Sequence, residues 1–139
     1  MSAEKNRAEA LRWLQTAREY METAEILHDA DRHAHACFHA QQAGEKALKA
    51  VWHMHAADPW GHSLRKLIED GRSALPEIFG KWMDLIEDAA RLDRYYIPTR
   101  YPNGLPDITP DAAFFHDDAE TAITLARKVI NRAALVLES

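Results

Sequence analysis

The sequence predicts an all-α protein, an up-and-down antiparallel four-helix bundle with an additional short helix, five helices in all. Apolar residues recur at three- and four-residue steps over most of the chain, and no segment shows the alternation typical of a β-strand. Turn-forming residues separate the periodic segments. With 139 residues, of which 47% are hydrophobic, the chain can bury one core, so we expect a single domain over residues 1–139.

The first two helices are expected over residues 7–27 and 33–55, on either side of the turn-forming residues 28–31. The apolar face of the first helix consists of Ala10, Leu14, Ala17, Met21, Ala24 and Leu27. The face of the second helix is made of small side chains, which would let a neighbouring helix approach closely: Ala36, Ala40, Ala43, Ala47 and Ala50.

Two further helices, a loop and a last helix complete the predicted bundle. Ser63 is expected to cap a short helix that ends near Ala74, and Pro76 suits the first turn of a helix over residues 77–95. Residues 97–111 contain four prolines, which predict an irregular loop. Long loops in small domains are often functional. The last helix is expected over residues 116–137.

Composition excludes several classes of protein. The 47% of hydrophobic residues, the 28% of charged residues and the few Gly and Pro together exclude a disordered or collagen-like chain. No apolar run approaches the roughly 18 residues of a membrane span, and residues 1–7 do not resemble a signal peptide. We therefore expect a cytoplasmic protein without membrane contact. Because the net charge is -5, the protein as a whole does not attract RNA, and RNA binding would require a local basic patch.

Polar residues on the second predicted helix form a strip beside the alanine face. Gln42, Glu45, Lys46 and Lys49 follow one another at steps of three and four. One interpretation is a solvated face with local ion pairs. The other is a cleft in which Lys46 or Lys49 meets an anion and Gln42 offers hydrogen bonds.

The junction between the fourth helix and the loop is rich in arginine and tyrosine. Arginine binds phosphate or carboxylate with a planar fork, and tyrosine offers a face for base stacking. The candidate ligand residues here are Asp93, Tyr96, Arg100 and Tyr101. In the alternative interpretation the tyrosines fix the loop to the bundle, and Arg100 pairs with Asp93 or caps a helix C-terminus.

The sequence offers little evidence for a metal site or for a catalytic nucleophile. His35 and His39 are four residues apart, a spacing that can serve one metal, but no carboxylate or cysteine joins them at ligand spacing. We expect surface histidines, no metal and no cofactor. Cys37, the single cysteine, is expected to fill a small space in the core.

Several segments together resemble the HEPN domain family, named for higher eukaryotes and prokaryotes nucleotide-binding. They cover nearly the whole chain: Gln41–Ala50, His62–Leu64, Leu92–Asp93, Tyr96–Pro102, Asp118–Ala119 and Ala122–Ala126. The resemblance implies a five-helix bundle that is often dimeric. It also implies pairing with a small nucleotidyltransferase, in some cases as toxin and antitoxin.

Many HEPN proteins are metal-independent ribonucleases marked by an arginine followed, after four to six residues, by a histidine. No histidine follows the late arginines at that distance, and Arg32 with His39 is the formal match. The leading hypothesis is therefore a non-catalytic module that dimerises, partners a nucleotidyltransferase and binds a nucleotide or phosphate. In it, Lys49 and Arg100 face phosphate, while Tyr96 or Tyr101 stacks on the base. The alternative is a toxin-like ribonuclease that uses Arg32 and His39.

The tryptophans bear on the predicted homodimer. Four Trp and four Phe are many for a small bundle to bury. Trp52, Trp60 and Trp82 are candidates for an interface, and each suits a core position equally well.

Overall fold

The computed structural model describes residues 2–138, and all of its regular secondary structure is helical, with no strand among those residues. The predicted all-α bundle is confirmed. The predicted domain also includes residues 1 and 139, which lie outside the described residues. The α-helices are α1 (Ala3–Asp29), α2 (His33–Met54), α3 (Leu64–Ala74), α4 (Pro76–Phe79), α5 (Ile86–Asp93), α6 (Pro110–Ala113) and α7 (His116–Glu138). Two 3-10 helices, η1 (Gly80–Leu85) and η2 (Pro102–Gly104), complete the set.

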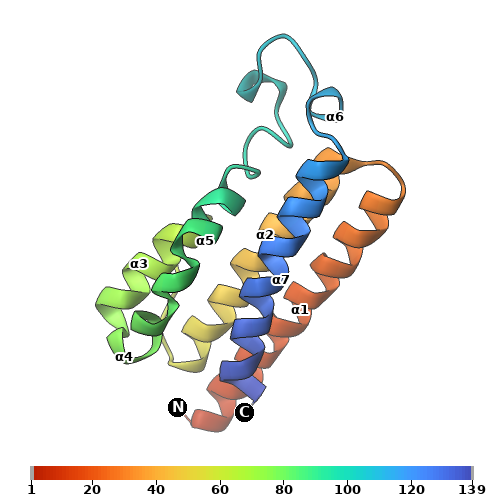
Figure 1. Ribbon diagram of the computed structural model, residues 1–139. Helices are drawn as coiled ribbons and strands as arrows, with labels where there is room; N and C mark the ends of the chain where they lie inside the picture. Colours follow the sequence, from red (N-terminus) through yellow and green to blue (C-terminus); the bar gives the residue numbers. More distant parts are fainter. Residues whose placement is uncertain (1, 139) are drawn as a thin grey trace.

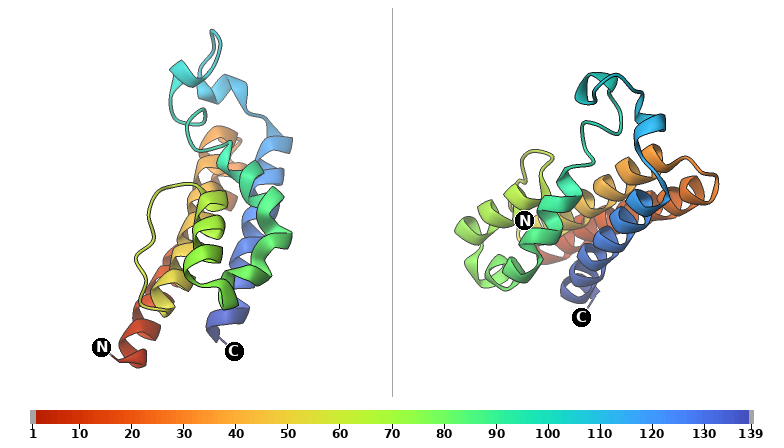
Figure 2. Two further views of the ribbon diagram at one scale, coloured as in Figure 1. Left: turned by 90° about the vertical axis from the view of Figure 1, so that its left-hand side faces the viewer. Right: turned by 45° about the horizontal axis from the view of Figure 1, so that its top comes forward.

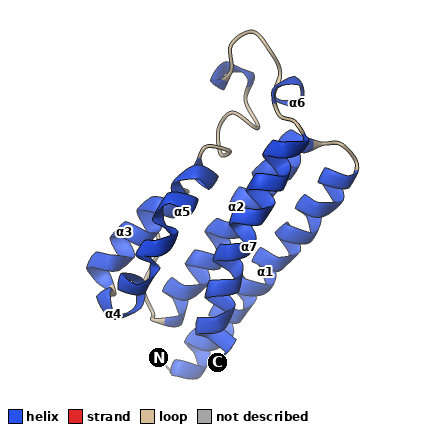
Figure 3. Cartoon of the chain, viewed as in Figure 1, coloured by secondary structure: helices blue, strands red, loops and turns tan. Residues whose placement is uncertain are grey.

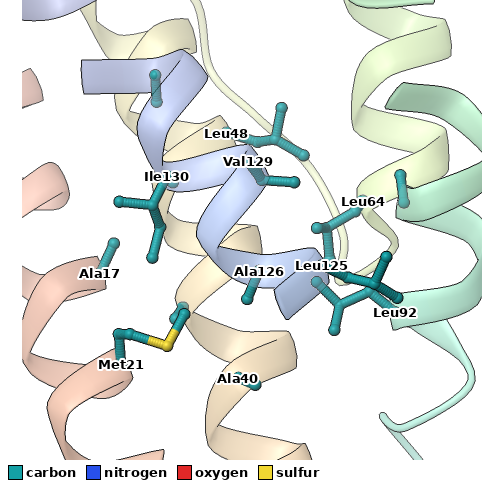
Figure 4. Packing of buried hydrophobic residues seen from close by; sticks show 14 of the residues in the cluster. Ala17, Met21, Ala40, Leu48, Leu64, Leu92, Leu125, Ala126, Val129 and Ile130 are labelled. Carbon is teal, nitrogen blue, oxygen red and sulfur yellow. The ribbon is translucent and has the colours of Figure 1, made fainter. Parts of the chain in front are cut away.

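The three long helices α1, α2 and α7 lie side by side, and α2 packs against both of the others (Figure 1). Small residues make this possible, since the predicted alanine face of α2 is completely buried. Larger side chains such as Met21, Leu48 and Ile130 fill the remaining space between the helices (Figure 4). The close packing of α2 keeps its polar strip next to the core.

The short helices α3 to α5 form a second layer beside α2 and α7 (Figure 2). The prediction of one continuous helix over residues 77–95 is wrong, because the segment divides into α4, η1 and α5. Phe79, Trp82 and Leu85 are spaced by three residues and all are buried. A 3-10 helix, with three residues per turn, places such a series on one face, whereas an α-helix would turn it away from the core.

The boundaries of the long helices are close to those predicted. Helix α1 begins at Ala3 rather than at residue 7 because Ser2 caps it, with its Oγ accepting from the amide of Lys5 at 3.1 Å. None of the described helices is both long enough and apolar enough to cross a membrane.

Residues 94–115 project beyond one end of the bundle, and loops dominate this segment (Figure 3). The predicted irregular loop is confirmed, with η2 and α6 as short helical turns inside it. Below this projection lie the end of α1 and the beginnings of α2 and α7 (Figure 1).

The three tryptophans considered for an interface have different environments. Trp52 and Trp82 belong to the core, with 6% and 1% of their surface exposed. Trp60, in the connection between α2 and α3, is 82% exposed. Of the three, only Trp60 remains available to a partner.

Candidate functional site

A buried carboxylate stands at the centre of the polar strip on α2. Glu45 is only 2% exposed, and its Oε2 accepts from Nζ of Lys49 at 3.0 Å. Nδ1 of His62 lies 3.3 Å from Oε1 of Glu45, and Nε2 of Gln42 donates to the same oxygen at 3.3 Å. Burying a charged carboxylate is costly unless such partners are present. The interpretation of the strip as a solvated face is therefore wrong for Gln42 and Glu45.

Glutamines extend this network towards the connection between α2 and α3. Gln41, which is fully buried, donates to the carbonyl oxygen of His62 at 2.8 Å and accepts from Gln42 at 2.8 Å. Lys46 donates to Oε1 of Gln42 at 3.3 Å, and its ammonium lies 4.7 Å from the ring centroid of Tyr20. Burial lowers the pKa of Lys46. We call Gln41, Gln42, Glu45, Lys49 and His62 the α2 network.

The predicted loop arginine is held among aromatic rings. Cζ of Arg100 lies 4.5 Å from the ring centroid of Phe38, 4.4 Å from that of Tyr96 and 4.8 Å from that of Tyr101. Its Nε donates to the carbonyl oxygen of Tyr96 at 3.0 Å. Cation–π attraction at this range fixes the guanidinium without neutralising its charge. We call these four residues the arginine cluster.

His62 joins the arginine cluster to the α2 network. Its ring stacks on Tyr96 with 4.8 Å between centroids and 18° between planes, while Nδ1 faces Glu45. Its side chain is 58% exposed, so it forms part of the surface. Sequence reasoning did not select His62 as a site residue; its place in one of the segments that resemble HEPN proteins was the available signal.

Asp93, a candidate ligand residue, contacts the first turn of α3. Its Oδ1 accepts from the amide of Leu64 at 2.7 Å, and its Oδ2 accepts from the amide of Arg65 at 3.0 Å and from Oγ of Ser63 at 2.8 Å. Ser63 itself caps α3 as predicted. Asp93 therefore holds the N-terminus of α3 rather than pairing with Arg100.

The candidate ribonuclease residues contact different elements. Nε of Arg32 lies 3.4 Å from Oδ1 of Asp111 in α6, whereas Nδ1 of His39 lies 2.9 Å from the carbonyl oxygen of His35. No hydrogen bond, ion pair or ring contact within residues 2–138 joins Arg32 to His39.

Cys37 occupies the core as predicted. It is fully buried in α2, and burial raises the pKa of its thiol to about 12. The thiol therefore stays protonated at neutral pH and lacks the thiolate that nucleophilic chemistry requires.

Solved structures resemble this chain over almost its whole length. The protein TT1696 from Thermus thermophilus is 38% identical with a TM-score of 0.84, and the match covers 91% of this chain and 97% of that one. An archaeal HEPN homologue, ST0689, is 25% identical with a TM-score of 0.75, covering 93% and 98%. A HEPN domain protein from Thermotoga maritima, TM0613, is 28% identical with a TM-score of 0.69, covering 91% and 98%.

No curated protein matches this chain. The HEPN domain pattern, in contrast, matches residues 10–136, which include both the α2 network and the arginine cluster. The chain belongs to the HEPN domain family.

Proposed function

We propose that the protein is a non-catalytic, cytoplasmic HEPN module that binds a nucleotide or another phosphate, forms a homodimer and partners a small nucleotidyltransferase in a toxin–antitoxin-like pair. The observation that carries this proposal is the arginine cluster, in which three aromatic rings hold one guanidinium at the edge of the bundle.

The arginine cluster suits a nucleotide better than the lysines of α2 do. Lys49 is paired with buried Glu45, so a phosphate at its ammonium would have to disrupt the α2 network. Arg100 hydrogen-bonds through Nε within the described chain, which leaves its Nη groups to approach a phosphate. The exposed rings of Tyr101 and His62 offer surfaces on which a base can stack, worth about 1–3 kcal/mol per base.

Exposed apolar side chains in the projecting segment support the homodimer. Ile97, Ile108 and Phe115 are between 45% and 67% exposed, and all lie within residues 97–115. Apolar side chains gathered in one exposed segment are typical of interaction surfaces. Because a carboxylate would be buried without a partner at such an interface, Ile108→Glu should shift the mass measured by light scattering from dimer to monomer. A wild-type monomer at micromolar concentration would refute this part.

The nucleotide part is tested by calorimetric titration with ATP. Arg100→Ala removes one charge-assisted contact, which is worth about 1.5–3 kcal/mol. The variant should therefore bind ATP at least about tenfold more weakly than the wild type does. Arg72→Ala, which removes an exposed arginine of α3, is the matched control and should leave affinity unchanged. Equal affinities for the two variants, with both shown to be folded, would contradict the proposal.

The partner is tested separately by co-expression of this protein with the product of any small nucleotidyltransferase gene that neighbours its own gene. A stoichiometric complex on size exclusion is the expected result, and two separate peaks would contradict it. The ribonuclease alternative gains no support from the contacts of Arg32 and His39, which lead to α6 and to the backbone of α2.

A further inference from the structure

Three histidines from three different helices meet at the end of the bundle below the projecting segment. His28 lies in the last turn of α1, while His33 and His116 are the first residues of α2 and α7. The ring centroids are 5.1 Å apart for His28 and His33, 4.6 Å for His28 and His116, and 5.9 Å for His33 and His116. These residues are distant in the sequence, so the antiparallel order of the helices brings them together.

Glu120 adds a carboxylate to the same place. It lies one turn after His116, and its Oε1 is 3.6 Å from Nε2 of that histidine. One donor atom each from His28, His116 and Glu120 lies within 4.8 Å of the other two. Donor atoms around a tetrahedral zinc ion are about 3.3 Å apart. The side chains of His116 and Glu120 are both 60% exposed, so small rotations can close the difference.

His33 contacts His28 through a ring nitrogen. Nδ1 of His28 lies 3.2 Å from Nδ1 of His33, which is within hydrogen-bond distance, so one ring can donate to the other. The side chain of His33 is only 12% exposed, and its Nε2 lies 3.6 Å from Oδ1 of Asp31. The imidazole of His33 therefore orients His28 in the way that outer hydrogen-bonding partners orient the histidine ligands of metal sites.

The surroundings favour a cation that carries water. His28 and Glu120 line an open pocket of about 460 Å³, to which Glu25 and Asp29 add carboxylates. Arg127 at the pocket is already paired with Glu25, with 2.7 Å between Nη2 and Oε1. Two imidazoles and one carboxylate with room for water form the donor set of an open zinc site.

We propose that His28, His116 and Glu120 bind a divalent transition-metal ion of the zinc class, and that His33 is a positioning residue for His28. The ion ties the ends of α1 and α7 together beside the start of α2. The site shares no residue with the arginine cluster, so its failure and the failure of nucleotide binding are distinguishable.

The test is titration of untagged protein with Zn²⁺ against a chromophoric chelator. We expect one ion per chain, with binding weakened by more than about tenfold in His28→Ala and His116→Ala and about 10- to 100-fold in His33→Ala. The matched control is His55→Ala, which removes an exposed imidazole about 30 Å away along α2. It should bind as the wild type does.

Two further measurements separate ligand loss from misfolding. Circular dichroism and thermal unfolding without metal should show that each variant is folded, and Zn²⁺ should raise the Tm of wild type and His55→Ala but not of His116→Ala. Co²⁺ should give visible absorption bands in the wild type that His116→Ala lacks. Equal Zn²⁺ affinities in His116→Ala and His55→Ala, or no binding by the wild type, would overturn the proposal.

Discussion

The carboxylate of Asp93 should determine the stability of the second helical layer, and Asp93→Ala tests this directly. The first amides of a helix have no partner within the helix, and Asp93 satisfies two of them in α3, at Leu64 and Arg65. It also accepts the hydroxyl hydrogen of Ser63, which orients the Oγ that accepts from the amide of Lys66 at 3.1 Å. One side chain therefore supports the whole first turn.

The expected loss follows from these contacts. The Leu64 amide is partly buried, so losing its bond to a charged acceptor costs about 1.5–3 kcal/mol. Water can replace the bond at the exposed Arg65 amide. A weakened cap adds up to about 1 kcal/mol, so Asp93→Ala should lower the free energy of unfolding by about 1.5–4 kcal/mol. Asp93→Asn, which retains one oxygen, should lose about half of that.

Urea unfolding followed by circular dichroism measures the difference at constant m-value. Asp58→Ala, at an exposed aspartate in the connection before α3, is the control and should lie within about 0.5 kcal/mol of wild type. Ser63→Ala combined with Asp93→Ala should cost less than the sum of the single changes, because the two side chains act together. If Asp93→Ala were as stable as Asp58→Ala and instead lost affinity for ATP, the capping argument would be refuted.

Two other predictions follow from burial. Gly71→Ala would place a Cβ 2.4 Å from Cδ2 of fully buried Phe79, so we expect urea unfolding to show a loss of about 1–3 kcal/mol. Gly80→Ala, where an added Cβ meets nothing within 4 Å, should be close to neutral. Because burial raises the pKa of Cys37 to about 12, the native thiol should react with Ellman's reagent far more slowly than in urea. Equal rates would contradict its burial.

The long helices could be predicted from the sequence because each shows its own apolar periodicity. Every predicted apolar position of the first helix up to Ala24 is buried, as is the alanine face of the second. Each of these faces follows from a periodic pattern within about 20 residues of sequence, so no long-range contact is needed to predict it. Helix ends depended on single capping residues: Ser63 was recognised, whereas Ser2 was not.

The fourth predicted helix failed because two periodicities follow one another in it. Phe79, Trp82 and Leu85 keep a step of three, and Ala89 and Leu92 continue at steps of four and three. Read as one series, they resemble an α-helix. The uninterrupted step of three was the available signal for the 3-10 helix η1. In the structure, η1 places Trp82 in the core, where it is 1% exposed.

The sequence predicted which residues of the candidate site share a helix face, but it did not predict that this face is buried. The spacing of Gln42, Glu45 and Lys49 placed them on one face, but it could not say that the face is buried. Burial depends on the connection carrying His62, which folds back from beyond α2 to contact Glu45. The same limit explains Asp93, whose partners lie 28 to 30 residues away in the sequence.

The cluster of His28, His33 and His116 shows how much of a long-range contact the order of the helices determines. In an up-and-down bundle the first helix ends where the second begins, and the last helix starts at that same end, so residues 28, 33 and 116 lie at one end of the bundle. Topology does not fix the rotation of each helix about its axis, which decides whether His28 or its neighbour Asp29 faces His116. That rotation is set by the burial of Ala24 on α1 and Ala119 on α7, about one turn from the histidines. Core packing thus aims the metal-binding side chains, and a substitution that enlarges either alanine should weaken Zn²⁺ binding without touching a ligand.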